Sequence, residues 1–175
     1  LEYAALNKSS TVFDASCRGT LELTGEERLE YINRLTTQQL IDLQEGESRV
    51  AFLISRTGGV LADAIIHALP NKILLDMDIT VVEQVCDHIT SYIVMEDVHI
   101  QDVTSSTHWM WCLGPTSQHI SIEKGTTFTL PLEFLGIDGV AIALHPSEVV
   151  QVWDELIEQG ITPIGWHALN MARVE

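Results

Sequence analysis

Apolar residues follow two different rhythms in the first part of the chain. In stretches such as 19–23 they alternate with polar residues, as in a half-buried strand. In 80–93 they instead fall at Val82, Val85 and Ile89, the spacing of one face of a helix. This pattern predicts strands at 19–23, 49–55, 60–69, 72–78 and 97–103, with one helix before residue 40 and another over 80–93.

Two short signals mark where these elements begin and turn. Thr24-Gly-Glu-Glu27 has the form of a capping box, with a hydroxyl at the helix start and a carboxylate three residues on. Arg56-Thr-Gly-Gly59 separates two strands, and glycine supplies the positive φ that tight hairpin turns need. We therefore predict a helix that opens at Thr24 and a hairpin closed at 56–59.

The rest of the chain predicts a second group of elements. Pro146 is a favourable first helical residue, and Gly160 is a favourable residue just after a helix end. The predicted order is a tail at 1–10, strands at 108–113, 119–123 and 140–144, a helix from 146 to 160, a connector at 161–164, and a last helix that begins near 166 and is cut off at 175.

This order of elements is typical of an α+β protein. Strand, helix, strands, helix and strand is the pattern of ferredoxin-like split βαβ units, in which helices cover one face of a mostly antiparallel sheet. We expect one domain over 1–175 with two lobes. Lobe 11–104 is predicted to be ferredoxin-like, and lobe 105–175 to be a second α+β unit truncated at its C-terminus.

The charge of the chain argues against one class of partner. Asp and Glu number 25 against 9 Lys and Arg, which gives a net charge of −16. Nucleic-acid backbones are bound mainly through Lys and Arg that neutralise phosphates. We therefore expect no direct nucleic-acid binding. With 46% apolar and 19% charged residues, the composition is that of a globular protein.

Cysteine and histidine positions indicate neither a disulfide framework nor a metal site. Cys17, Cys86 and Cys112 are odd in number and form no C-x-x-C pair. The seven histidines do not fall at metal-ligand spacing. No apolar run approaches the roughly 20 residues that span a bilayer, and no signal peptide is visible. We expect no metal, no membrane partner and a reducing, cytoplasmic location.

Four segments, taken together and in this order, carry a family resemblance. They are Val12-Phe-Asp-Ala-Ser16 with Leu23-Thr-Gly25, Tyr31-Ile-Asn-Arg-Leu-Thr-Thr-Gln38, Gly58-Gly-Val-Leu-Ala-Asp63, and Tyr92-Ile-Val-Met-Glu-Asp-Val98 with Asp102-Val103. Leu113-Gly-Pro115 and the terminal residues 168–175 extend the match. The set resembles the superfamily of the glycine cleavage T protein, an aminomethyltransferase, and the YgfZ-type folate-binding proteins.

The resemblance implies a folate-binding domain built from two interlocked βαβ-type units. A small C-terminal β-barrel normally follows in this family, and it is absent from this sequence. The implied cofactor is tetrahydrofolate or a derivative, and the oligomeric state stays open. In the T protein an aspartate near the reactive end of tetrahydrofolate assists aminomethyl transfer, because it tunes protonation and stabilises developing charge.

The chain departs from the enzyme at the position of that aspartate. The T protein has two adjacent acids after its Gly-Gly turn, the first of them catalytic, and the matching residues here are Ala62 and Asp63. Asp63 would replace the missing acid only if the strand slips by one position, because neighbouring strand residues point to opposite faces. The aromatic residue that the family places near the folate falls at Val50, and the glycine-rich segment is reduced to 135–139.

These departures favour the YgfZ type. That reading predicts a tetrahydrofolate-binding protein that supports iron–sulfur cluster assembly or maintenance and, indirectly, tRNA modification, with iron–sulfur proteins as partners. The alternative is an aminomethyltransferase-like enzyme that transfers a one-carbon unit to tetrahydrofolate. A third reading is a decayed domain used only for protein contacts. Because Ala62 cannot accept a proton, whether the chain is an enzyme stays open.

The candidate folate contacts lie in three places. Glu175 matches the acid that ends the last family segment, and a carboxylate there accepts both donors on the amino-pyrimidine edge of the pterin. Gly58 and Gly59 would let a ligand approach the backbone of their turn. Gln38 and Arg56 are polar groups beside predicted loops.

Overall fold

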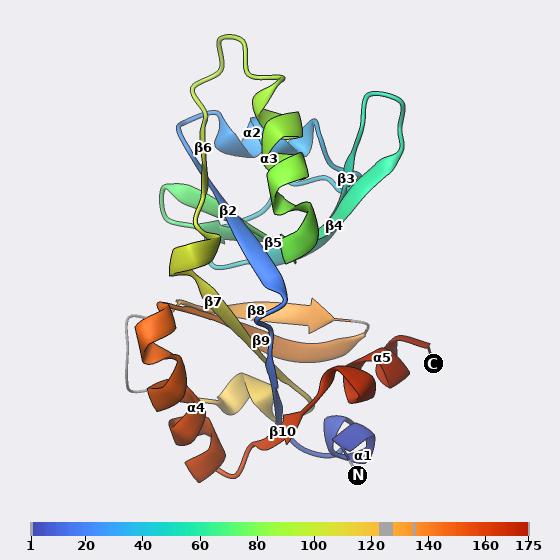
Figure 1. Cartoon of the computed structure of the whole chain (residues 1–175), viewed down its shortest axis with the longest axis vertical. Coiled ribbons are helices and arrows are strands. Elements are labelled where there is room, and N and C mark those ends of the chain that lie inside the picture. Colours follow the sequence, from blue (N-terminus) through green and yellow to red (C-terminus); the bar gives the residue numbers. More distant parts are fainter. Residues whose placement is uncertain (1, 123–127, 135, 175) are drawn as a thin grey trace. The chain divides into compact units, whose positions relative to one another are not determined.

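The structure is a computed structural model that describes residues 2–122, 128–134 and 136–174. The chain divides into two compact units (Figure 1). One comprises residues 17–105 and is called here the inserted unit, and the other joins 1–16 to 106–175 and is called the terminal unit. The strands of the described residues form two five-stranded sheets, one in each unit. With helices beside both sheets, this confirms the predicted α+β class.

The sheet of the inserted unit has the strand order β3-β4-β5-β2-β6, and every neighbouring pair is antiparallel. β5 and β6 are therefore parallel, are connected by α3 and have β2 between them. This is the split βαβ arrangement that the sequence predicts. The elements are β2 (Arg18–Thr24), α2 (Arg28–Asn33), β3 (Ser48–Ile54), β4 (Val60–Leu69), β5 (Lys72–Asp78), the 3₁₀ turn η1 (Ile79–Val81), α3 (Val82–Thr90), β6 (His99–Asp102) and η2 (Thr104–Ser106).

One face of this sheet forms a core with α2 and α3. Ile32 of α2 and Val85 and Ile89 of α3 are fully buried, in one cluster with sheet residues such as Ile66. The Tyr31 hydroxyl also donates to the Ile89 carbonyl, which links the two helices. Figure 1 shows these helices, α2 and α3, next to each other. Burial of each such apolar side chain stabilises the fold by roughly 1.5–3 kcal/mol. The residues that show helical spacing in the sequence are thus the ones that face the core from α3.

The sheet of the terminal unit has the order β10-β1-β7-β9-β8. β1 and β10 are parallel and the other neighbours are antiparallel. Val152 and Leu156 of α4 are fully buried against one face, in a cluster with Met110 and Ile142. The elements are α1 (Glu2–Leu6), β1 (Thr11–Asp14), β7 (His108–Leu113), η3 (Ser117–His119), β8 (Phe128–Phe134), β9 (Ile137–Leu144), η4 (Pro146–Glu148), α4 (Val149–Glu158), β10 (Thr162–Ile164) and α5 (Trp166–Val174).

Short elements of the terminal unit differ from the prediction. The expected tail at 1–10 contains α1, and the expected connector at 161–164 contains β10. Three or four residues show no periodicity, so β10 becomes a strand by pairing with β1, and β1 by pairing with both β10 and β7. β8 contains Pro131, which lacks the N–H that a central strand needs. It is tolerated because β8 lies at the sheet edge. The strand expected at 119–123 is absent from its described part, 119–122.

The predicted capping box is also wrong. Thr24 is the last residue of β2, where it pairs with Lys72 of β5. The helix begins at Arg28, with Glu27 as an N-cap whose side chain makes no cap bond. The Glu27 carboxylate instead accepts the Asp97 N–H at 2.6 Å. A partner distant in sequence therefore replaces the local bond that the motif normally makes.

The loop before β6 is organised by one carboxylate. The N–H groups of Val94 and Met95 donate to the Glu96 carboxylate at 3.0 and 3.2 Å, and Arg34 donates at 3.1 Å. The backbone bonds, that of Val94 first, favour the charged form and lower the pKa of Glu96 to about 2. The loop therefore keeps its shape while this carboxylate is ionised.

Replacing Glu96 by Gln should destabilise the protein at neutral pH, with a difference that fades in acid. A depressed folded-state pKa contributes stability above the ordinary value of 4.5, and the contribution is lost as pH falls through about 2. Urea unfolding of wild type and Glu96→Gln at pH 7, 4 and 3 measures this. Glu30→Gln, at an exposed acid of α2, serves as the control. A difference that is undiminished at pH 3 would contradict the assignment.

Gly25 and Gly58 should respond differently to alanine, although both have positive φ, at +104° and +80°. A Cβ at Gly58 meets no heavy atom within 4 Å, so Gly58→Ala should cost only about 1 kcal/mol, the conformational penalty. A Cβ at Gly25 would clash with the Asp97 carbonyl oxygen, so Gly25→Ala should cost clearly more. Unfolding in urea measures both losses, and equal values would contradict this explanation.

Candidate functional site

The β3–β4 hairpin holds three of the candidate ligand contacts. Arg56, Gly58 and Gly59 lie exposed in its turn, which projects from the sheet (Figure 1). Ser55 closes the turn, because its N–H donates to the Gly59 carbonyl at 2.8 Å and its carbonyl accepts the Gly58 N–H at 3.0 Å. The Gly59 N–H donates to the Ser55 hydroxyl at 3.0 Å. Both glycine N–H groups are thus used inside the turn, and the turn offers a ligand its side chains and an open surface.

Gln38 lies beside the same hairpin, because the residue before it forms hydrogen bonds with β3. The Thr37 N–H donates to the Phe52 carbonyl at 3.0 Å, and the Thr37 hydroxyl accepts the Phe52 N–H at 3.2 Å. A bridge between Thr36 and Leu53 continues this pairing. The exposed Gln38 therefore follows directly on a segment fixed beside Phe52. Glu175, the remaining candidate contact, lies outside the described residues, as does residue 135 of the reduced glycine-rich segment.

The register between β3 and β4 changes just before the two residues that match the family's acids. Leu53 pairs with Ala62, but the next residue, Ile54, pairs with Val60. Leu61 is thus one extra residue in β4, which is a β-bulge. The pairing is regular from Ser48 with His67 to Leu53 with Ala62, so the bulge affects only the residues between it and the turn. Asp63 therefore lies in the regular part of the ladder, and no slip of one position moves it to the face of Ala62.

The two residues after the bulge point to opposite faces of the sheet. Ala62 is 6% exposed and packs with Leu53 in the core beneath the helices. Asp63 is exposed on the other face, directly opposite Phe52 on β3. A carboxylate at position 62 would lie in the apolar core. Of the two matching positions, only Asp63 presents its side chain to a ligand.

Phe52 is a site residue that the sequence argument missed. Its side chain is 47% exposed, and it shares a face of β3 with Val50, the position assigned to the family's aromatic residue. The two-residue period of a strand could have identified it, because residues 50 and 52 lie two apart and therefore share the open face of β3. An aromatic ring beside a carboxylate can stack on a planar heterocycle while the carboxylate accepts its N–H groups.

A buried polar line continues on the face of the sheet that carries Asp63. Arg18 Nε donates to the Asp76 carboxylate at 2.6 Å, and these side chains are 10% and 0% exposed. On the next strands, Ser48 and His67 share a hydrogen bond of 2.7 Å between Oγ and Nδ1. Removing one partner of the buried Arg18–Asp76 ion pair would be costly, so this pair holds β2 and β5 together beside the hairpin.

The described residues contain neither a group of metal ligands nor a membrane-spanning helix. No three His, Cys, Asp or Glu side chains within 2–122, 128–134 and 136–174 are grouped so that they could hold a metal ion. In this same part of the chain, no helix is long and apolar enough to cross a bilayer.

Comparison with known proteins identifies the family. Residues 1–127 match the GCVT N-terminal domain, and the chain belongs to this family. Similar proteins include the aminomethyltransferases of Chlorobaculum tepidum, 27% identical over 99% of this chain and 55% of the relative, and of Alkaliphilus metalliredigens, 22% identical over 99% and 54%. A putative chloroplast transferase of Arabidopsis thaliana is 24% identical over 97% and 44%. The chain spans about half the length of these relatives.

Two solved structures share the fold. The glycine cleavage system aminomethyltransferase T from Bartonella henselae matches 98% of this chain and 52% of its own, with a TM-score of 0.83 and 16% identity. A chain of the heterotetrameric sarcosine oxidase from Corynebacterium sp. U-96 matches 98% of this chain and 91% of its own, with a TM-score of 0.56 and 14% identity. At these identities the likeness concerns the fold alone.

Restoring the family's acid at position 62 should destabilise the protein. Ala62→Asp places a carboxylate in the core without a partner, at an expected loss of about 3–5 kcal/mol. Asp63→Ala changes an exposed side chain and should alter stability by no more than about 0.5 kcal/mol. Urea unfolding at pH 7 compares the two variants. If Ala62→Asp were as stable as wild type, the assignment of the two faces would be wrong.

Proposed function

We propose that this chain forms the folate-binding part of an aminomethyltransferase-like protein, with Asp63 as the acid at the reactive end of tetrahydrofolate. The observation that carries the proposal is the exposed Asp63 opposite the exposed ring of Phe52. Membership of the GCVT family and the names of the similar aminomethyltransferases support it.

The chemistry requires a group that handles a proton and a developing positive charge. Transfer forms bonds from two folate nitrogens to the aminomethyl carbon, while the bonds from that carbon to the departing ammonia and to its donor break. The attacking nitrogen becomes positively charged and must lose a proton. An ionised carboxylate at that nitrogen stabilises the charge and accepts the proton. Asp63 has the required side chain and lies on the open face, whereas Ala62 has neither property.

The other candidate contacts take supporting roles in this proposal. Arg56 would bind the carboxylates of the folate glutamate tail through its guanidinium fork, and Gln38 would add hydrogen bonds beside Phe52. Glu175 keeps its role from the family resemblance, as the acceptor for the pterin's amino-pyrimidine edge. The turn at Gly58 and Gly59 would lie against the ligand without contributing its N–H groups.

A second candidate function is the YgfZ type, in which folate is bound but no aminomethyl group is transferred. Ala62 favours it, because that position lacks the acid found in the enzyme. In this case the protein would support iron–sulfur proteins. The two functions differ in one observable property, since both require folate binding and only the first requires transfer.

Folate binding and transfer should depend on different side chains. Saturable micromolar binding of 5-formyltetrahydrofolate, followed by the fluorescence of the four tryptophans and by calorimetry, should weaken about tenfold in Phe52→Ala through the lost ring contact. Asp63→Asn should bind folate but form methylenetetrahydrofolate from an aminomethyl donor about 10²–10⁴-fold more slowly. Asp87→Asn, at an exposed acid of α3, is the matched control.

Three outcomes separate the alternatives. Binding with no transfer by the wild type would replace the first function by the second. Transfer that is unchanged in Asp63→Asn would remove Asp63 from the reaction. No binding up to millimolar folate would contradict both functions.

A further inference from the structure

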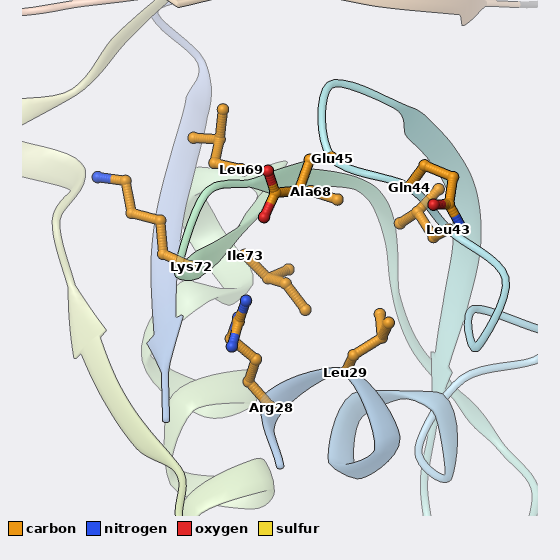
Figure 2. Close-up of a pocket in the computed structure, with 9 residues that line it drawn as sticks. All are labelled: Arg28, Leu29, Leu43, Gln44, Glu45, Ala68, Leu69, Lys72 and Ile73. Carbon is orange, nitrogen blue, oxygen red and sulfur yellow. The ribbon is translucent and has the colours of Figure 1, made fainter. Parts of the chain in front are cut away.

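A hollow with a volume of about 230 Å³ lies at the far end of β4 from the Gly58–Gly59 turn (Figure 2). β4 has 10 residues, so at about 3.4 Å per residue the hollow is on the order of 30 Å from that turn. Its walls come from the start of α2, the loop at 43–45 and the strand ends on either side of the β4–β5 turn. It is therefore separate from the candidate folate site within the same unit.

The floor of this hollow is apolar. Leu43, Leu69 and Ile73 line it and are each no more than 5% exposed, and Leu29 closes one side. An apolar group that enters the hollow leaves water at roughly 25 cal/mol per Å² of buried surface. The floor thus favours a ligand with a hydrocarbon side chain.

Arg28 at the wall lacks a carboxylate partner. Its Nη1 donates to the Gly25 carbonyl at 2.8 Å, and its Nε is buried without a hydrogen bond among the residues that the structure describes. A half-buried guanidinium is a strong site for an incoming carboxylate, which it binds through charge-assisted hydrogen bonds.

Four other basic side chains of the described residues have acidic partners in the protein. Arg18, Arg34, Arg49 and Lys72 each form an ion pair with a carboxylate. Lys72 also lines the hollow, but its ammonium pairs with Glu22 at 2.8 Å and points away from the centre in Figure 2. Arg28 is therefore the cation that the hollow offers to a ligand.

The opposite wall carries the complementary charge. Figure 2 shows the Glu45 carboxylate reaching toward the hollow from the side across from the Arg28 guanidinium. Glu45 is exposed, and a ligand ammonium could approach it from solvent. A guanidinium and a carboxylate across an apolar floor match a ligand that has a carboxylate, an ammonium and a hydrocarbon side chain.

We propose that this hollow binds an apolar α-amino acid such as leucine, with the ligand carboxylate on Arg28, its ammonium near Glu45 and its side chain on Leu43, Leu69 and Ile73. The size agrees, because a volume of about 230 Å³ is below the roughly 300–1,000 Å³ of pockets for drug-sized ligands and so favours a small ligand over tetrahydrofolate. The proposal does not rest on the function proposed above.

Calorimetric titration of the whole chain with L-leucine and with 4-methylpentanoate, the same skeleton without the amino group, tests the site. Leucine should bind saturably with a Kd of about 1 mM or tighter. Arg28→Gln should weaken leucine binding about tenfold or more. Glu45→Gln should weaken leucine binding and leave that of 4-methylpentanoate unchanged. Arg34→Gln, at an exposed arginine at the other end of α2, is the matched control and should change neither.

Circular dichroism checks that Arg28→Gln is folded, and the exposed Glu45 provides a test that does not depend on that variant. Absence of saturable leucine binding up to about 50 mM, well above the expected Kd, would overturn the proposal. Leucine binding that is unchanged in folded Arg28→Gln would also overturn it. Equal binding of 4-methylpentanoate and leucine, with no effect of Glu45→Gln, would overturn the assigned role of the ammonium.

Discussion

The pairing of β3 with β4 is the constraint on which the candidate site depends. Side chains alternate across a strand, so a shift of one residue moves every side chain to the opposite face. The regular pairing from Ser48 with His67 to Leu53 with Ala62 sets the faces, so Ala62 packs with Leu53 in the core and Asp63 stands opposite Phe52 on the open face. The bulge at Leu61 changes the pairing only on the turn side of Ala62 and leaves these two positions unaffected.

The rest of the inserted unit holds this hairpin in place. α2 and α3 cover the side on which Ala62 is buried, and their apolar residues resist any change that would bring a charge there. On the other side, the buried pair of Arg18 and Asp76 joins β2 to β5. β4 pairs with β5 over six residue pairs, so the hairpin extends from a fixed sheet. A site built on such strands keeps its geometry better than one on loops.

The sequence predicted the long periodic elements well and the short or non-local ones badly. α3 and the strands of the inserted unit carry enough apolar positions to be recognised. β10 has three residues, and the proline of β8 is tolerated only at a sheet edge, a position that pairing decides. The capping box predicted at Thr24 is absent because the Glu27 carboxylate accepts a hydrogen bond from the N–H of Asp97, which is distant in sequence. Phe52 was missed because the family's aromatic residue was matched to Val50 by position alone. That match does not consider Phe52, which lies two residues further on the same face of β3.

The placement of the folate is the point that a single measurement tests most directly. Amide chemical shifts of ¹⁵N-labelled protein can be followed while 5-formyltetrahydrofolate is added. We expect the largest changes at Phe52, in the turn at 56–59 and at Asp63, with little change around Arg28 and Ile73. If the changes concentrated elsewhere and left Phe52 and Asp63 unmoved, the open face of the β3–β4 hairpin would not be the folate site.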